Sequence, residues 1–160
     1  MQILHLNKRP QYIEVIAKWL FDEWGYQRPG SNLETAILGI EEKSQGNNIP
    51  SIFVAEIDGK AVGTVSLVRH DMDIRKEVSP WVASLYVHKD LRHKKIGRKL
   101  MHFIEDFAKD IDIEKIYLFT PNKQEMYTKI GWRAIEDLEY LSEDVTIMSK
   151  DLIENQQRTE

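Results

Sequence analysis

The sequence contains no cysteine among its 160 residues. Disulfide bonds and thiolate metal ligands are therefore excluded, and residence in a reducing compartment is expected. No apolar run approaches the roughly 20 residues that a membrane-spanning helix needs. The first residues, MQILHLNKRP, lack the long apolar region of a secretory signal. Together these absences predict a cytoplasmic protein with no membrane partner.

Basic charge is not in excess either. Lysine and arginine total 22 against 26 acidic residues, which gives a formal net charge of −4 at pH 7. That balance argues against a nucleic-acid partner, because nucleic-acid-binding proteins usually present a net basic face. Hydrophobic residues make up 42% and charged residues 30% of the chain, proportions typical of a folded soluble domain rather than a disordered chain.

The sequence has no internal repeat and no low-complexity tract, and we predict one domain over residues 1–152 with a polar tail over 153–160. Apolar spacings of three and four predict helices at 10–24, 32–43, 95–109 and 122–130. Strands are predicted at 2–6, 51–57, 61–68, 81–87, 115–120, 132–140 and 145–151. Asp58-Gly59 predicts a type I′ hairpin turn, since both positions need positive φ. The strands at 81–87 and 115–120 should be parallel, with antiparallel strands on both sides.

The most informative stretch is a basic turn that follows a predicted buried strand, in SLYVHKDLRHKKIGRKL (Ser84–Leu100). Six of the twelve residues from His88 to Lys99 are lysine or arginine, in a chain that is acidic overall. A strand that leads into a helix through a turn aims the first N–H groups of the helix at one point, where an anion can bind. The basic side chains around that point predict a diphosphate ligand; they are Arg92, Lys94, Lys95 and Arg98.

This turn and a second motif downstream resemble the GCN5-related N-acetyltransferase (GNAT) family. The family signature, Q/R-x-x-G-x-G/A after a strand of the type LYV, reads here Arg92-His93-Lys94-Lys95-Ile96-Gly97 after Leu85-Tyr86-Val87. Roughly thirty residues later the family has a tyrosine in a short helix, then glycine and an aromatic residue; here these are Tyr127, Gly131 and Trp132. One departure is that Lys95 occupies the position of the first glycine.

The resemblance implies the acyl-CoA N-acyltransferase fold, a mixed, mostly antiparallel central sheet of about seven strands with helices on both faces. It also implies acetyl-CoA as co-substrate, no metal, and transfer of the acetyl group to a primary amine by direct attack. The expected acceptor is a small-molecule or peptide amine. Many members of the family form dimers through their last strands, so a homodimer is one of the states that the resemblance allows.

Roles for individual residues also follow from the resemblance. The diphosphate should contact Arg92, His93, Lys94, Lys95, Ile96, Gly97 and Arg98. The pantetheine arm should pair with the strand edge formed by Leu85, Tyr86 and Val87, with the Val87 N–H stabilising the oxyanion. Tyr127 is expected to protonate the departing thiolate, because a hydroxyl with a pKa of about 10 still carries its proton at neutral pH.

The sequence does not identify the base that takes the proton of the attacking amine. Family members often place a glutamate on the central strand, where this chain has Ala83 and Ser84. Candidates in segments expected to border the acceptor side are Glu23, His70, Asp71 and Asp73.

The resemblance also implies that the loops at 21–31 and 69–80 form the walls of the acceptor site. Both mix acids with aromatic residues or with basic ones, which slightly favours a cationic amine over an anionic acceptor. The aromatic residues expected to line the acceptor wall are Trp24, Tyr26 and Trp81.

Two other functional classes stay open. An acyl-CoA-binding sensor or partner protein would keep the fold but lack turnover, and the absent strand glutamate suits that hypothesis. A nucleotide-binding regulator would use the same turn, although the sequence contains neither G-x-x-x-x-G-K-S/T nor G-x-G-x-x-G. The histidines at 88, 93 and 102 do not have the spacing of a common zinc site.

Overall fold

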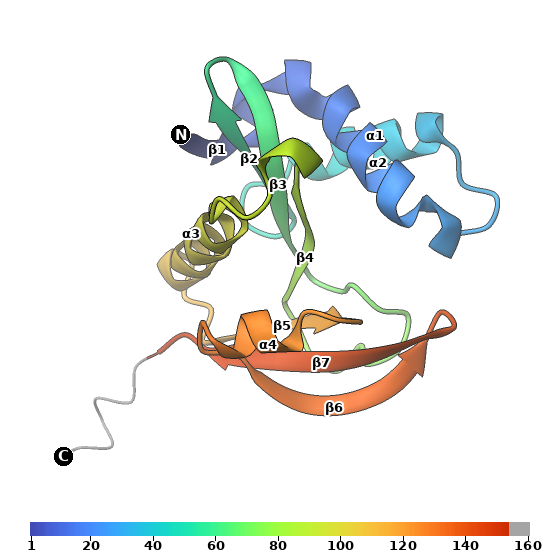
Figure 1. Ribbon diagram of the computed structural model, residues 1–160, viewed down its shortest axis with the longest axis vertical. Helices are drawn as coiled ribbons and strands as arrows, with labels where there is room; N and C mark the ends of the chain where they lie inside the picture. The colour runs from blue at the N-terminus through green and yellow to red at the C-terminus, as the bar shows by residue number, and fades with distance from the viewer. Residues whose placement is uncertain (154–160) are drawn as a thin grey trace.

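Seven strands form one sheet in the computed structural model, which describes residues 1–153 (Figure 1). Their order is β1-β2-β3-β4-β5-β7-β6, and each neighbouring pair is antiparallel except β4 and β5, which are parallel. The strands are β1 (Gln2–His5), β2 (Ser51–Ile57), β3 (Lys60–Val68), β4 (Trp81–Val87), β5 (Lys115–Thr120), β6 (Arg133–Tyr140) and β7 (Glu143–Asp151). The predicted mixed sheet is confirmed, and the predicted tail lies outside the described residues except for Ile153.

Helices cover both faces of the sheet, as predicted. They are α1 (Ile13–Trp24), α2 (Leu33–Ser44), α3 (Ile96–Asp110) and α4 (Gln124–Thr128), with short 3₁₀ turns η1 (Leu6–Lys8), η2 (Pro10–Tyr12), η3 (Gly25–Gln27) and η4 (Lys89–Leu91). Strand β2 shows the division, because Ile52 and Val54 are buried with α1 and α2, whereas Phe53 is buried with α3. Within residues 1–153, no helix has the length and apolar character needed to cross a membrane.

Local sequence signals set two of the turns. The Asn32 side chain accepts a hydrogen bond from the Thr35 N–H at 2.8 Å and begins α2. Asp58 and Gly59 have φ of 50° and 74°, which confirms the predicted positive φ at both positions of the β2–β3 turn. The helix predicted at 122–130 is too long, because α4 ends at Thr128 and Gly131, at φ 99°, turns the chain toward β6.

The parallel strands β4 and β5 pair at one end and then separate. Within the described chain their register consists of Trp81 opposite Tyr117. The two strands diverge from that point, so the second half of β4 has no strand neighbour on the β5 side (Figure 1). The sheet is therefore split into a half formed by β1–β4 and a half formed by β5–β7, with an open wedge between them.

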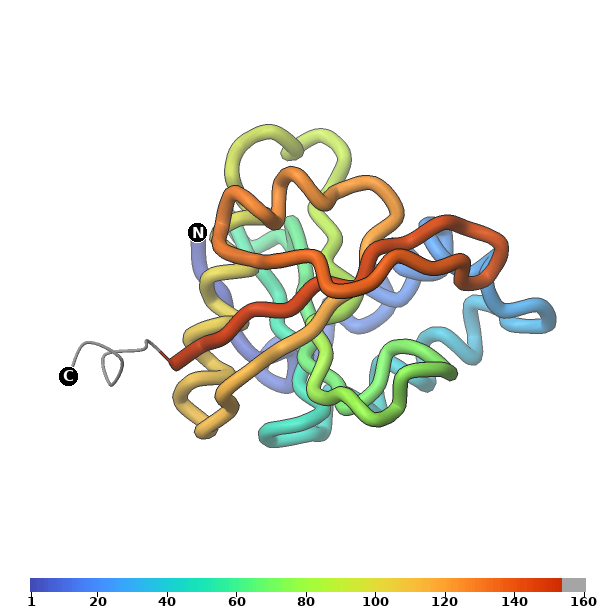
Figure 2. Tube along the Cα trace, turned by 90° about the horizontal axis from the view of Figure 1, so that it is seen from below, coloured from blue at the N-terminus to red at the C-terminus, as the bar shows by residue number. Residues whose placement is uncertain are grey.

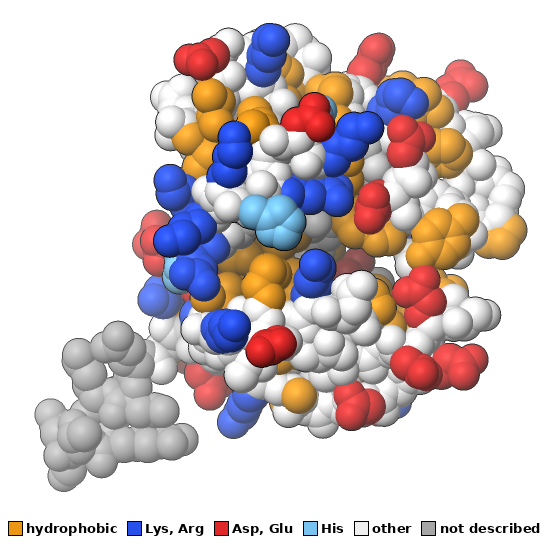
Figure 3. Space-filling model, in the orientation of Figure 1, with side chains coloured by type: hydrophobic (Ala, Val, Ile, Leu, Met, Phe, Trp, Pro, Cys, Tyr) orange, Lys and Arg blue, Asp and Glu red, His pale blue; other side chains and the backbone are white. Residues whose placement is uncertain are grey.

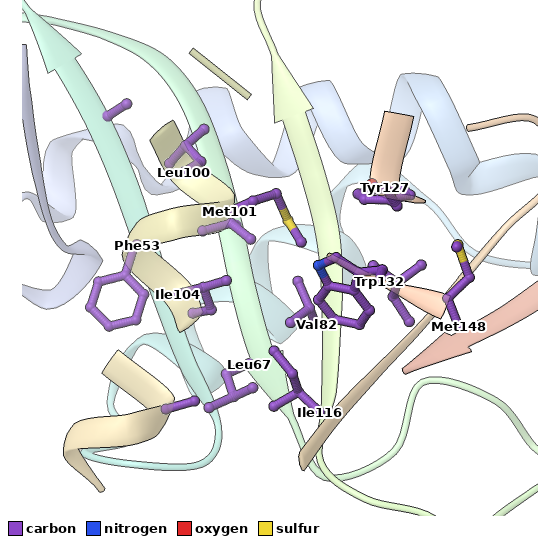
Figure 4. Close-up of a cluster of buried hydrophobic side chains, with 14 of the residues drawn as sticks. Phe53, Leu67, Val82, Leu100, Met101, Ile104, Ile116, Tyr127, Trp132 and Met148 are labelled. Atoms are coloured by element: carbon purple, nitrogen blue, oxygen red, sulfur yellow. The ribbon is translucent and has the colours of Figure 1, made fainter. Parts of the chain in front are cut away.

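The main hydrophobic cluster fills the space between α3 and both halves of the sheet. From α3 it includes Leu100, Met101 and Ile104, each fully buried. Across from the helix, Trp132 and Met148 belong to the β5–β7 half, and Figure 4 shows these side chains in one continuous group. Burying each such side chain contributes roughly 1.5–3 kcal/mol, so α3 is firmly fixed against both halves.

The turn between β4 and α3 has an unusual backbone. His93 and Lys95 have φ of 66° and 65°, and Lys95 is the residue before the first helical residue of α3. A left-handed conformation favours glycine, because a Cβ there meets the following carbonyl. This explains why the resembling family has glycine at the position of Lys95, and the chain retains the conformation with a lysine.

Replacing Lys95 with glycine should raise the free energy of unfolding by about 1 kcal/mol, because glycine adopts this conformation without the steric cost. Urea unfolding would measure the gain. Lys94→Gly is the matched control, since it removes a lysine from the same turn at a position that does not have positive φ. Equal stabilities of the two variants would contradict the strain at Lys95.

Candidate functional site

The wedge between the sheet halves opens on a face of uneven charge. Figure 3 shows this face hollowed between the two halves. Lysine and arginine side chains gather over α3 and the turn that precedes it, whereas acidic side chains gather near the end of the β6–β7 hairpin (Figure 3). An anion is therefore favoured at one end of the wedge and a cation at the other.

The free edge of β4 begins at a bulge. The β3–β4 register shifts between Ala83 and Tyr86, and Ser84 in this interval has φ 56°. At the end of the strand the His88 N–H donates to a β3 carbonyl at 2.8 Å. Because backbone groups alternate in direction along a strand, the N–H and carbonyl of Val87 point to the opposite edge, into the wedge.

Arg92 is hydrogen-bonded to this edge of β4. Its Nε donates to the Val87 carbonyl at 3.0 Å, and its guanidinium carbon lies 5.3 Å from the centroid of the Tyr86 ring. Tyr86 in turn stacks on Trp19 of α1 at 5.4 Å. Within residues 1–153 no hydrogen bond uses the two terminal nitrogens of Arg92, so the guanidinium is oriented and still able to bind an anion.

The structure brings the other predicted diphosphate residues together at the same turn. Ile96 is 6% exposed and packs in the core, so it offers its backbone N–H and not its side chain. Gly97 is half-buried. Lys95 gives α3 no side-chain cap, which leaves the first N–H groups of the helix open to a ligand. The exposed side chains are those of Arg92, His93, Lys94, Lys95 and Arg98.

Tyr127 lies on α4, across the wedge from β4. It is 8% exposed, and burial raises its pKa to about 12. Its ring packs against Trp132 with centroids 6.2 Å apart, and Figure 4 shows both in one cluster with Val82 of β4. Within the described residues no hydrogen bond engages its hydroxyl, and the raised pKa means that the hydroxyl keeps its proton at neutral pH.

The four base candidates differ in environment. Glu23, His70 and Asp73 are exposed. Asp71 is half-buried in the β3–β4 loop, and burial raises its pKa to about 7, although the nearby cations Lys43 and Arg28 act in the opposite direction. Asp71 is thus the candidate whose environment most changes its chemistry, a common property of functional carboxyl groups.

The aromatic wall differs from the prediction. Trp81 is fully buried, with its indole N–H donating to the Val78 carbonyl at 2.9 Å, so the prediction that it lines the acceptor site is wrong. The Trp24 ring lies 6.4 Å from the ring of Tyr86, the same tyrosine on which Trp19 stacks. Trp19 is not among the residues predicted for this wall, because no signal in the sequence places α1 against the end of β4.

Two tethers close the side of the wedge opposite the basic turn. The tip of the β6–β7 hairpin reaches the connection between α1 and α2, where the Tyr26 hydroxyl donates to Glu143 Oε1 at 2.6 Å (Figure 2). In the β3–β4 loop, Arg75 Nε donates to Glu136 of β6 at 2.8 Å, and this cation holds the pKa of Glu136 below its usual value. The predicted acceptor loops are thereby fixed to the β5–β7 half.

Two open hollows of about 600 and 500 Å³ lie elsewhere on the molecule. The larger runs between β1 and α3 over Phe53, Phe103 and Phe107, and the smaller lies between α1 and α2. Neither is lined by the β4 edge, the basic turn or Tyr127, which together form the candidate site.

The chain matches the family model described as the acetyltransferase (GNAT) family over residues 13–132. A curated relative, the probable N-acetyltransferase camello of Xenopus tropicalis, is 31% identical over 105 residues, which are 63% of this chain and 47% of the relative. The chain therefore aligns with about half the length of that relative.

Solved structures share the fold at low sequence identity. An aminoglycoside 6'-acetyltransferase type Ii superposes with a TM-score of 0.77 at 18% identity, covering 97% of this chain and 99% of that one. An aminoglycoside 6'-N-acetyltransferase complexed with coenzyme A gives 0.75 at 16%, with the same coverage. A ribosomal-protein-alanine N-acetyltransferase from Brucella melitensis gives 0.74 at 16%, covering 94% and 99%.

The architecture is thus the acyl-CoA N-acyltransferase fold that the sequence predicts. The family match includes the β4 edge, the basic turn before α3, and Tyr127 on α4. The chain belongs to the GNAT family of acetyltransferases.

Proposed function

We propose that the protein is an acetyl-CoA-dependent N-acetyltransferase that moves the acetyl group to a primary amine by direct attack. One observation carries the proposal: the free backbone edge of β4 ends beside an oriented arginine and the open first turn of α3. A thioester with a diphosphate tail needs these two features next to each other. A structure of the same fold is described as complexed with coenzyme A, which supports this cofactor.

The basic turn is proposed to bind the diphosphate. Arg92 is already oriented by Val87 and Tyr86, so little side-chain entropy remains to be lost when it binds. The flanking lysines add charge, and the open N–H groups of α3 add directional hydrogen bonds. Because the Val87 carbonyl already accepts from Arg92, the Val87 N–H is the group at this end of the edge left to face the thioester carbonyl.

The reaction then needs two proton transfers. The amine nitrogen bonds to the carbonyl carbon, the C–S bond breaks, and the sulfur accepts the proton of the Tyr127 hydroxyl. A base removes the surplus proton of the amine. We assign that role to Asp71, whose pKa of about 7 lies near the pH at which a general base works well. The acidic end of the wedge also suits a cationic amine.

Replacing Arg92 with alanine should weaken CoA binding by about tenfold at low salt and by less at high salt, because a charged contact is screened. A thermal-shift titration with acetyl-CoA, CoA and ATP measures this; a ligand at a hundred times its Kd stabilises by about 2.7 kcal/mol. Lys109→Ala, in the last turn of α3 and far from the basic turn, is the control. An unchanged Kd would place the diphosphate elsewhere, and equal binding of ATP would favour a nucleotide-binding protein.

Tyr127→Phe should lower kcat by roughly 10²–10⁴ and change the Kd for CoA by less than about twofold, because the hydroxyl acts on the leaving thiolate. A thiol reagent detects released CoA without background, since the chain has no cysteine. The acceptor panel is a polyamine, an aminoglycoside and a peptide with a free amino terminus. Tyr117→Phe is the control. CoA binding without amine-dependent release would point to an acyl-CoA sensor instead.

Asp71→Asn should lower kcat/KM and abolish the decline of kcat/KM that a protonated base causes below about pH 7.

The same substitution should also stabilise the fold. The folded protein keeps a proton on Asp71 up to about pH 7, whereas the unfolded chain loses it near pH 4, so stability falls as pH rises through this window. The variant should therefore gain up to about 4 kcal/mol at pH 8 and less at pH 5. Unfolding and activity are compared with Asp73→Asn, and full activity of Asp71→Asn would exclude it as the base.

A further inference from the structure

A buried ionic cluster lies between α3, β7 and the turn that follows α4. Glu105 of α3 is 5% exposed, and its Oε1 accepts from Lys150 Nζ at 2.7 Å. Its Oε2 accepts from the Trp132 indole N–H at 3.2 Å. Lys150 also donates to the Ile130 carbonyl at 2.7 Å. The Glu105 carboxylate, the Lys150 ammonium group and the Trp132 indole N–H are thus hydrogen-bonded to one another in a site that is mostly closed to water.

This cluster holds the turn that carries Tyr127. The N–H groups of Ile130 and Trp132 donate to the Tyr127 carbonyl at 3.0 and 3.1 Å, and the Trp132 ring packs on the Tyr127 ring. Gly131 between them has φ 99°, and a Cβ there would lie 3.1 Å from the Lys150 Cε. The Lys150 side chain therefore packs close to Gly131, where both the limited space and the positive φ favour glycine.

The helix α4 needs such external support. It has five residues, and a helix this short is not stable by itself. Its first turn is tied to β7 through Gln124 Nε2, which donates to the Thr146 hydroxyl at 2.9 Å. Its last turn depends on the cluster. The position of the Tyr127 hydroxyl is consequently set by tertiary contacts rather than by the helix.

The cluster also spans the wedge. Glu105 lies on α3, which packs on the β1–β4 half, whereas Lys150 and Trp132 belong to the β5–β7 half. Glu105 is nine residues after Ile96, or about 13 Å along the helix from the open first turn. One rigid helix therefore joins the proposed diphosphate site to the contacts that hold Tyr127.

We propose that Glu105 is a positioning residue, which acts through Lys150 and Trp132 to fix the distance between the basic turn and the Tyr127 hydroxyl. The inference rests on the proposed function, since it assumes that Tyr127 donates a proton to a thiolate. The two carboxylate oxygens of Glu105 accept from Lys150 and Trp132, and no hydrogen bond in residues 1–153 joins them to Tyr127 or to β4. Its effect on turnover passes through Tyr127, because a displacement of about 1 Å at a catalytic group can cost about a hundredfold in rate.

The test removes the cluster without leaving a buried charge. The double variant Glu105→Met/Lys150→Met replaces both charged side chains with apolar ones. Proteins often tolerate such a replacement of a buried ion pair without loss of stability. The double variant should bind CoA within twofold of the parent and melt within a few degrees of it, yet show a kcat at least tenfold lower. The exposed pair Lys115–Asp151 supplies the control, Asp151→Asn.

A background of Tyr127→Phe separates positioning from a general structural effect. If the cluster acts through Tyr127, its removal from that background should lower kcat by less than twofold further. The same tenfold loss in both backgrounds, or no loss in the parent, would overturn the inference. Should Tyr127→Phe alone keep the parent rate, the proposed proton donor itself is wrong and the inference falls with it.

Amide hydrogen exchange provides a readout that needs no acceptor. Removing the cluster should speed exchange at least tenfold in the segment 124–132, and leave α1 unchanged. If exchange in 124–132 stays at the parent rate, Glu105 does not position this turn, whatever the activity shows.

Discussion

The structure depends on the short pairing between the parallel strands β4 and β5. Their parallel pairing consists of Trp81 opposite Tyr117, after which the strands separate and leave the backbone of β4 open on one side. An unpaired strand edge inside a domain has N–H and carbonyl groups that must find partners. Here Arg92 takes the Val87 carbonyl, and the remaining groups suit the amides of an extended ligand.

A split sheet needs another element to hold its halves together, and α3 does so. Its apolar face packs on both halves through fully buried side chains such as Leu100 and Met101. Hydrophobic burial holds the helix in place but is not directional. The hydrogen bonds of Glu105 add direction, because the carboxylate meets Lys150 and Trp132 in one geometry. Packing thus supplies the stability of the wedge, and the buried ionic cluster its shape.

Charge is distributed to match this shape. An acidic chain concentrates lysine and arginine at the turn before α3, and a group of acidic residues lies toward the other end of the wedge, near the β6–β7 hairpin. Two carboxylates at the acidic end accept hydrogen bonds within the protein, Glu143 from Tyr26 and Glu136 from Arg75. Asp71 is different, because burial raises its pKa without a pairing cation close enough to offset the effect. Its placement costs stability at neutral pH and gives a carboxyl group that exchanges protons there.

The sequence by itself determined the elements, because short-range rules govern them. Short apolar segments predicted the strands 51–57 and 81–87 at their observed bounds, Asp58-Gly59 set its turn, and the spacing of Arg92, Gly97 and Tyr127 indicated the family. Only the tertiary structure decided which side chains meet. It buried Trp81, stacked Trp19 on Tyr86, and joined Glu105 to residues 27 and 45 positions later. Such contacts arise from packing between distant segments, and no local periodicity in the chain records them.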